Sequence, residues 1–361
     1  MKNLLYIFFF VIYLGSCTSA PGDYLVLDNV VYVENFPEVF ILDNGTPVNL
    51  DVIGILSISI EDSMIIVTTS DKKGMWSFYS LPEYYFMGKY LTMGMGPNEF
   101  LSTPLVEQQN IFKQSGHLLG LIYDFQSGKL YKMNISETLQ KNRLSMSQTS
   151  DSLPRFLFNF TMIDTNTFLC KEVNNNRTQQ IRYVLRQGWN KSSRNLEKLN
   201  AASIRQGENI NILATDTKRS SDGKKIVEVG IALNQINLYS IDDSFGKTIC
   251  VGKQVDNINK IQNVDRRERM YTYINVTAHP NYFSALYLND TDINYQRGTS
   301  KNPSIQFIDW DGKPLAEIKL DRMITSYAID FIHGSLYVVD SNSEEELYKY
   351  DILEVLKKIK L

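Results

Sequence analysis

Few residues of the kinds that build catalytic or metal centres occur in this chain of 361 residues. It has three cysteines, three histidines and no CxxC pair, so a tetrahedral zinc site has no evident ligand set. A glycine-rich phosphate loop, a GxSxG elbow and an HExxH helix are also missing, which argues against the enzyme classes that these motifs mark. We therefore expect neither a metal nor a cofactor.

Neither sign of charge dominates, and no apolar run is long. The 37 basic residues nearly balance the 40 acidic ones, giving a formal net charge of −3, so a basic face for nucleic acid is not expected. The longest apolar run, Leu4–Leu14, falls short of the roughly 20 residues of a membrane-spanning helix. With 43% hydrophobic and 21% charged residues, the composition is that of a folded protein.

The N-terminal stretch has the organisation of an export signal. Lys2 precedes the apolar run, and Leu14-Gly15-Ser16-Cys17 follows it directly. This order resembles a lipobox, in which small residues fit the signal peptidase and the cysteine carries the lipid. We predict a signal peptide over residues 1–16, lipidation of Cys17 and a lipidated tether over 17–24. A plain secretory peptide cleaved near Ser19-Ala20 is the alternative.

The other two cysteines, Cys170 and Cys250, lie in apolar, strand-like runs. Cysteine packs as a small hydrophobe in such places, so two buried free thiols are expected. Because an exported protein can also form disulfides, a bond between the two is the alternative.

From residue 25 onward the chain predicts strands almost throughout. An apolar run, a polar turn and a second apolar run recur six times, with successive spacings of 55, 48, 58, 59 and 51 residues between the landmarks Ile66, Leu121, Leu169, Val227, Leu286 and Tyr337. Short strands at this period are typical of four-stranded propeller blades. We predict an all-β fold, a single six-bladed β-propeller over residues 25–361.

Helices are expected only in a few places, and the chain has no Pro/Gly/Ser-rich linker that would divide it into two domains. The predicted helices lie around Ser136–Lys141 and Val264–Met270, and a short C-terminal helix is expected over Ile352–Lys360. The ring must also close. We expect the strand-rich segment Val26–Leu42 to pair with the last blade, and a strand laid along the outside is the alternative.

Three motifs carry a resemblance to a known family. They are Gly94-Met95-Gly96-Pro97-Asn98-Glu99-Phe100, the strand Tyr282–Tyr287 (YFSALY) and the turn Phe307–Pro314 (FIDWDGKP). Together with the lipobox they resemble the TolB-like six-bladed β-propeller lipoproteins of bacteria, over nearly the whole chain. The resemblance implies the fold and an envelope location, and it brings no established catalytic residues. It departs from the family at Leu288-Asn289, where relatives often carry Ser-Gly.

The first of these motifs is expected to be structural. Gly94 and Gly96 permit turn conformations closed to other residues, and Pro97 fixes φ. We expect Glu99 to accept backbone N–H groups beneath the turn, and Phe100 to pack between blades. The alternative makes Glu99 a ligand contact on the rim.

One stretch carries residues suited to ligand recognition. Arg266 and Arg269 lie in a charged segment that also contains tyrosines, and His279 and Tyr287 follow. Arginine beside tyrosine suits carboxylates, phosphates or sugar faces. These four residues are the candidate ligand-binding residues, and a solvated linker that forms salt bridges within itself is the alternative.

Two functions fit these observations. The first is a non-enzymatic binding or scaffold module, anchored by its lipid to the outer membrane of the cell envelope, that holds an envelope protein or a glycan at the propeller mouth. The second is a polysaccharide-degrading hydrolase or lyase with two carboxylates at the same mouth. An enzyme should show clustered acids with shifted pKa values, and a binding module should show an aromatic or apolar rim.

Overall fold

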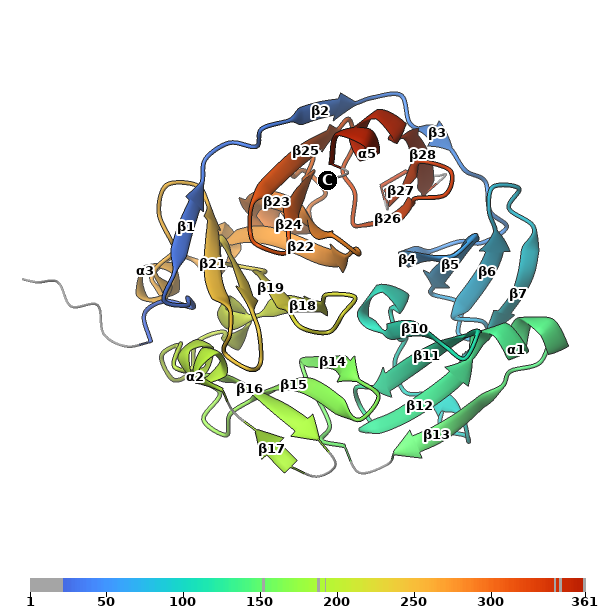
Figure 1. Cartoon of the computed structure of the whole chain (residues 1–361), viewed down its shortest axis with the longest axis horizontal. Coiled ribbons are helices and arrows are strands. Elements are labelled where there is room, and N and C mark those ends of the chain that lie inside the picture. Colours follow the sequence, from blue (N-terminus) through green and yellow to red (C-terminus); the bar gives the residue numbers. More distant parts are fainter. Residues whose placement is uncertain are drawn as a thin grey trace, which may run out of the picture.

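The computed structural model describes residues 22–150, 153–186, 189–191, 193–340, 342–343 and 346–359. Over these residues the chain forms a ring of six mainly antiparallel sheets (Figure 1). Cavities between their inner strands mark a central channel. The predicted six-bladed β-propeller is thereby confirmed. The predicted signal peptide, Cys17 and most of the predicted tether lie outside the described residues.

The first three blades follow one another along the chain, each with four strands. Blade 1 consists of β4 (Ile55–Glu61), β5 (Met64–Thr69), β6 (Trp76–Ser80) and β7 (Phe86–Tyr90). Blade 2 consists of β10 (Asn110–Gln114), β11 (His117–Asp124), β12 (Lys129–Asn134) and β13 (Met146–Ser150). Blade 3 consists of β14 (Asn159–Asp164), β15 (Thr167–Val173), β16 (Gln180–Arg186) and β17 (Trp189–Lys191).

The last three blades also receive strands from the N-terminal segment. Blade 4 consists of β18 (Thr215–Arg219), β19 (Ile226–Gly230), β20 (Gln235–Tyr239) and β21 (Gly246–Val251). Blade 5 consists of β22 (Met270–Ala278), β23 (Tyr282–Thr291), β24 (Ser304–Asp309) and β25 (Pro314–Leu320). Blade 6 contains β26 (Ser326–Asp330), β27 (Ser335–Val339) and β28 (Leu347–Asp351).

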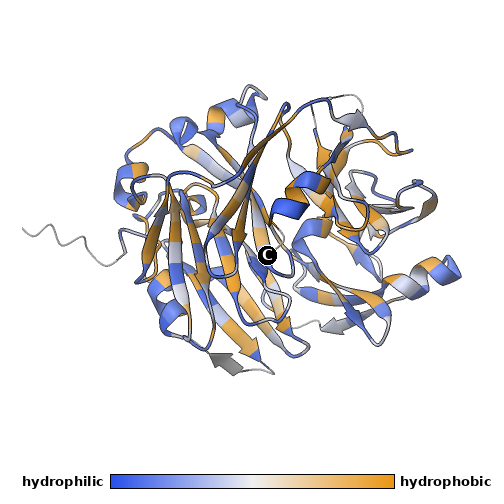
Figure 2. Cartoon of the chain, turned by 45° about the horizontal axis from the view of Figure 1, so that its top comes forward, coloured by the Kyte–Doolittle hydropathy of each residue, from blue (hydrophilic) through white to orange (hydrophobic). Residues whose placement is uncertain are grey.

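The middle strands of the blades are buried on both faces because a neighbouring blade packs against each side. The strands β5, β19, β20 and β27 are buried along their whole length. Six hydrophobic clusters form the core, one at each interface between neighbouring blades. Figure 2 shows the apolar residues concentrated on the strands, and the helices mostly polar. The buried Cys170 and Cys250 are both free thiols within this core.

The N-terminal segment runs around the outside of three blades (Figure 1). β1 (Val30–Val33) pairs in parallel with β21, and β2 (Val39–Leu42) pairs in parallel with β25. β3 (Thr46–Pro47) pairs with β28 and completes blade 6. The prediction that Val26–Leu42 closes the ring is therefore wrong, since this segment extends blades 4 and 5 at their outer edges. Its alternating exposure suits an outer edge, and the strand pattern alone does not say which edge.

Short helices lie in the connections. They are α1 (Ile135–Lys141), α2 (Arg194–Asn200), α3 (Ile258–Gln262), α4 (Asp292–Gln296) and α5 (Leu353–Ile359), with the 3₁₀ turns η1 (Val106–Gln108), η2 (Ile210–Leu213) and η3 (Arg266–Glu268). The predicted C-terminal helix is confirmed as α5. The helix predicted around Val264–Met270 shrinks to η3, because β22 already begins at Met270. In the part of the chain that the structure describes, no helix is long and apolar enough to cross a membrane.

The glycine-rich turn follows blade 1 and joins β8 (Thr92–Met93) to β9 (Glu99–Phe100). Glu99 Oε2 accepts the N–H of Gly96 at 2.7 Å, and the buried ring of Phe100 packs against Tyr131 of blade 2 at 5.0 Å between centroids. A glycine is needed at position 94 for a different reason from the one expected. Its φ is not positive, but a Cβ atom there would collide with the Glu99 carboxylate.

Candidate functional site

A short segment of the chain enters the central channel. η1 contacts β4 and β5 of blade 1, and Figure 1 shows the chain that leads into β10 lying inside the ring. Glu107, on η1, reaches three other blades: its Oε2 accepts from Ser326 Oγ at 2.6 Å and from Asn275 Nδ2 at 3.3 Å, and its carbonyl accepts from Lys218 Nζ. η1 therefore plugs the channel, with cavities at both ends.

The Glu107 side chain has an altered acidity. Burial of its carboxyl raises the pKa of Glu107 to about 7, and the negative charge of Asp216 adds to this effect. The hydrogen bond from Ser326 opposes the rise without cancelling it. Near neutral pH the Glu107 carboxyl therefore exists in both protonation states, so it can donate or accept a hydrogen bond.

A cavity of about 450 Å³ opens where the inner strands of blades 3, 4 and 5 begin. We call it the aromatic cavity, because Tyr123, Phe125, Phe158 and Tyr271 line it. Phe125 is 38% exposed and Phe158 is 41% exposed, so part of each residue is open to solvent. The volume lies within the roughly 300–1,000 Å³ that ligand pockets occupy.

Two buried amides line the same cavity. Gln180 is 1% exposed and Asn275 is 5% exposed. Neither Nε2 nor Oε1 of Gln180, nor Oδ1 of Asn275, has a hydrogen-bond partner among the residues that the structure describes. Because each such buried group left unpaired costs about 1–3 kcal/mol, native proteins rarely keep them without a reason.

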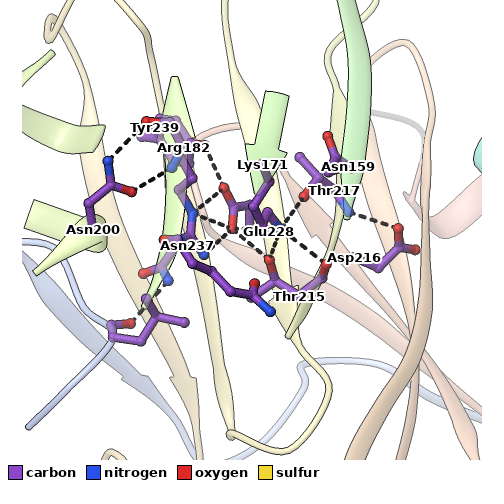
Figure 3. Close-up of polar contacts among 12 residues, drawn as sticks. Asn159, Lys171, Arg182, Asn200, Thr215, Asp216, Thr217, Glu228, Asn237 and Tyr239 are labelled. Atoms are coloured by element: carbon purple, nitrogen blue, oxygen red, sulfur yellow. Dashed lines mark hydrogen bonds and ion pairs between the residues drawn. The ribbon is translucent and has the colours of Figure 1, made fainter. Parts of the chain in front are cut away.

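A charged network lies behind the cavity wall, between blades 3 and 4 (Figure 3). Arg182 Nε and Nη2 donate to the Glu228 carboxylate at 2.9 and 2.8 Å, Thr215 Oγ1 and Tyr239 OH each donate to it at 2.6 Å, and Lys171 Nζ lies 3.4 Å from Oε2. Burial alone would raise the pKa of Glu228, but the two cations hold it well below its usual range. Burial lowers the pKa of Lys171.

The inner strands end at the opposite mouth of the channel. Two adjoining cavities there, of about 240 and 280 Å³, share Lys218, His279 and Pro280. His279 is buried, with Nε2 lying 2.8 Å from Ser284 Oγ, and burial lowers the pKa of His279 to about 3. Its imidazole is therefore uncharged near neutral pH. No cluster of three His, Cys, Asp or Glu side chains suited to a metal ion occurs in the described part of the chain.

The chain matches the family described as TolB-like 6-blade propeller-like over residues 56–331. The chain belongs to this family. The match confirms the resemblance drawn from the three motifs, all of which lie within the matched residues. No curated protein matches the chain by sequence.

Solved structures resemble this TolB-like propeller in fold. A member of the DUF4221 family from Bacteroides vulgatus has a TM-score of 0.52 at 13% identity, over 85% of this chain and 95% of the other. A luciferin-regenerating enzyme has a TM-score of 0.45 at 11% identity, over 84% and 94%. Hydrazine synthase from Kuenenia stuttgartiensis has a TM-score of 0.43 at 14% identity, over 88% and 82%. At 13% identity the likeness to the DUF4221 protein extends to the fold alone.

The four residues predicted to bind a ligand do not come together in this TolB-like propeller. Arg266 is exposed on η3, and the buried Arg269 forms an ion pair with Glu208 at 3.1 Å. His279 follows the other end of β22, and the nine residues of that strand span roughly 30 Å. Tyr287 lies on β23, partly buried. They are too dispersed for one site, and a role for any of them in binding stays a prediction.

Sequence reasoning missed Glu107, Gln180 and Asn275, which come from the channel plug and from two different blades. No local motif joins them, because only the closed ring brings them to one cavity. One signal was available on β16, where Gln180 and Arg182 alternate with apolar residues and yet form the more buried face. When polar and apolar residues alternate along a strand, the apolar face is normally taken to be the buried one. A strand whose polar face is buried is therefore not recognised from its sequence.

Proposed function

We propose that this TolB-like propeller is a lipid-anchored binding module of the bacterial cell envelope, held at the outer membrane through Cys17, that binds its ligand without chemical turnover. The observation that supports it is the aromatic cavity, which is lined by two exposed phenylalanines and by two buried amides. Both polar atoms of the Gln180 amide and the Oδ1 of Asn275 have no partner among the described residues. Aromatic surface with a few converging polar groups is the usual make-up of a ligand pocket. The ligand is a glycan or a protein segment of the envelope.

The position of the N-terminal segment fits this proposal. The carbonyl of Gly22 accepts from Ser203 N at 3.1 Å, and that of Asp23 accepts from Ile258 N at 2.9 Å. Both donors precede the start of an inner strand, so the first described residues lie at the same end of the ring as the aromatic cavity. The chain from Cys17 to Gly22 reaches at most roughly 18 Å. A lipid on Cys17 would hold the cavity end of the propeller toward the membrane.

A polysaccharide hydrolase or lyase is the second candidate, and one observation favours it. Glu107 and Asp216 line the same cavity, and the charge of Asp216 raises the pKa of Glu107. A carboxyl group with a raised pKa beside a second carboxyl group is an arrangement that glycoside hydrolysis uses. However, Asp216 Oδ2 already accepts the N–H of Val276 at 3.0 Å, and Glu107 is held by Ser326, so both serve the fold.

The test combines localisation with turnover. The full chain is expressed in a bacterial host as wild type, Cys17→Ser and the control Thr18→Ala, which keeps the cysteine. We expect wild type and Thr18→Ala in the outer-membrane fraction with an acylated N-terminus, and Cys17→Ser without the lipid and out of that fraction. An unlipidated wild type would contradict the anchor.

The same preparations are incubated with envelope and plant polysaccharides, and newly formed reducing ends are measured. We expect none above background. Turnover that disappears in Glu107→Gln would replace the binding module by the enzyme.

A further inference from the structure

We propose that the aromatic cavity binds a neutral oligosaccharide, whose hydroxyl groups bond to Gln180 and Asn275 and whose sugar rings pack on Phe125 and Phe158. This inference rests on the proposed function and names its ligand class. It is drawn from three independent features of the cavity: the buried amides, the exposed rings and the arrangement of charge.

The unpaired amide atoms can be satisfied by a ligand group that both donates and accepts hydrogen bonds. A glutamine side chain offers two N–H donors and a carbonyl acceptor, and a sugar hydroxyl matches both roles. Gln180 shares one face of β16 with Arg182, but each guanidinium nitrogen already donates elsewhere. Nε and Nη2 donate to Glu228, and Nη1 donates to the Gln180 backbone carbonyl at 3.1 Å. The neighbouring charged network therefore leaves the buried Gln180 amide without a partner among the described residues, at the wall of the cavity.

The rings at the rim supply flat apolar surface. Phe125 and Phe158 meet edge to face, at 6.3 Å between centroids and 84° between planes, so the two rings present different orientations to a ligand. Phe156 packs on Phe125 at 5.3 Å and has a φ of 60°, which is rare for a bulky residue. Backbone strain of this kind concentrates at functional sites. The apolar C–H face of a pyranose covers such rings and removes their surface from water.

The charges select an uncharged ligand. Glu107 and Asp216 line the cavity, and the amine of Lys218 is engaged with the Glu107 carbonyl. The two other cations nearby, Lys171 and Arg182, are buried against Glu228 behind the wall. A uronate, sulfate or phosphate group would therefore meet two acids and one lining cation, Lys218, whose amine already donates to a carbonyl. This balance of charge disfavours anionic glycans.

The test titrates the purified full chain with neutral oligosaccharides from mannan, xylan, β-glucan and galactan, and with anionic ones from polygalacturonate and heparin, by isothermal calorimetry. We expect at least one neutral oligosaccharide to bind and the anionic ones not to bind. Gln180→Met removes the amide at nearly constant volume and should weaken binding by about tenfold or more, the equivalent of one hydrogen bond lost. Phe158→Ala should weaken it similarly.

The chain offers matched controls. Gln235 on β20 is also 1% exposed, also carries an amide without a partner among the described residues, and does not line the aromatic cavity. Gln235→Met should leave binding unchanged, as should Phe86→Ala at an exposed ring on blade 1. Thermal unfolding of each variant separates a lost contact from a lost fold.

Each possible result either supports or overturns the oligosaccharide site. No neutral ligand in the panel, a preference for anionic ones, or equal binding by folded Gln180→Met would overturn the oligosaccharide site. If instead an envelope protein binds and Phe158→Ala abolishes that binding, the binding module stands and its ligand is a protein. If neither class binds, the proposed function fails with the inference. Sugar binding accompanied by turnover keeps the site and overturns the absence of catalysis.

Discussion

Two polar regions lie side by side in this propeller, and they differ in how completely their groups are paired. In the network between blades 3 and 4, every oxygen of Glu228 accepts from at least two donors. In the aromatic cavity, the Gln180 amide and one atom of Asn275 have no partner within the described residues. Thr215 belongs to both regions, since it lines the cavity and donates to Glu228.

This difference separates a network that serves only the structure from a binding site. We call the charged network of Lys171, Arg182 and Glu228 between blades 3 and 4 the brace. A buried charge that is fully paired specifies how two blades dock, and it offers nothing to a ligand. A buried amide without an internal partner lowers stability unless something from outside pairs with it. The predictions that follow test whether the brace carries stability and whether the cavity carries recognition.

The largest effect is expected from breaking the brace. Glu228→Gln keeps the shape and removes the negative charge, so Lys171 and Arg182 remain buried without a counter-charge. Removing one partner of a buried pair typically costs about 3–5 kcal/mol, and the free energy of unfolding, measured in urea, should fall by that amount. A loss below about 1 kcal/mol would show that the network is not a brace.

The plug of the channel should show its effect through pH. Because the pKa of Glu107 is raised from its ordinary value of 4.5 to about 7, the folded state binds more protons within that window. The wild type therefore loses stability as the pH rises through it, and Glu107→Gln does not. We compare the free energies of unfolding of the wild type and of Glu107→Gln. Between about pH 5 and pH 8, the difference between them should grow by about 1–3 kcal/mol in favour of the variant.

The control for this effect is Glu137→Gln. Glu137 has its pKa lowered, chiefly by a hydrogen bond from Lys141, so it titrates below the same window. A difference that stays constant from pH 5 to pH 8 for Glu107→Gln would contradict the raised pKa. A difference that grows equally for Glu137→Gln would assign the effect to the fold in general.

A smaller effect, an increase in stability, is expected at the cavity wall. Gln180→Met replaces an unpaired amide by an apolar group of similar volume, so the free energy of unfolding without ligand should rise by up to about 1 kcal/mol. Differential scanning calorimetry with and without the bound oligosaccharide measures it. A variant that is less stable without ligand would mean that the Gln180 amide serves the fold.

The smallest change is expected at the second cation of the brace. Lys171→Met leaves Arg182 and Glu228 as a one-to-one pair and removes a charge that burial already disfavours. We expect the free energy of unfolding to change by less than about 1 kcal/mol, because an apolar side chain of similar volume often replaces a buried charge without loss. A loss as large as that of Glu228→Gln would show that all three charges act as one unit.

The sequence predicts the repeating part of the fold better than its exceptions. The six hairpins and the C-terminal helix follow from local pattern, because each strand's period and each turn's residues act over a few positions. Ring closure was assigned to the wrong segment, since Val26–Leu42 has the same pattern whether it extends blades 4 and 5 or completes blade 6. Which edge it takes depends on strands more than 200 residues away, as in the bond between Leu27 N and Thr248 Oγ1.

The candidate site was harder to predict for the same reason. The charged run around Arg266 stands out in the sequence, and the structure places it in a connection, with Arg269 paired to Glu208. The polar groups of the cavity are single residues within ordinary strands, such as Asn275 in β22. A residue of this kind becomes conspicuous only when its neighbours in space are known and its missing partner can be seen.

The outer belt of β1, β2 and β3 also sets the order in which this protein can be completed. Blades 1, 2 and 3 contain only consecutive strands, so each can form as soon as its own stretch of chain has emerged. Blades 4, 5 and 6 need strands from the beginning of the chain, and the bond between Gly54 N and Glu346 Oε2 spans 292 residues. β1 must therefore wait unpaired for blade 4, β2 for blade 5 and β3 for blade 6. The ring is completed only when the last blade pairs with β3, and contacts of such long range are slow to form.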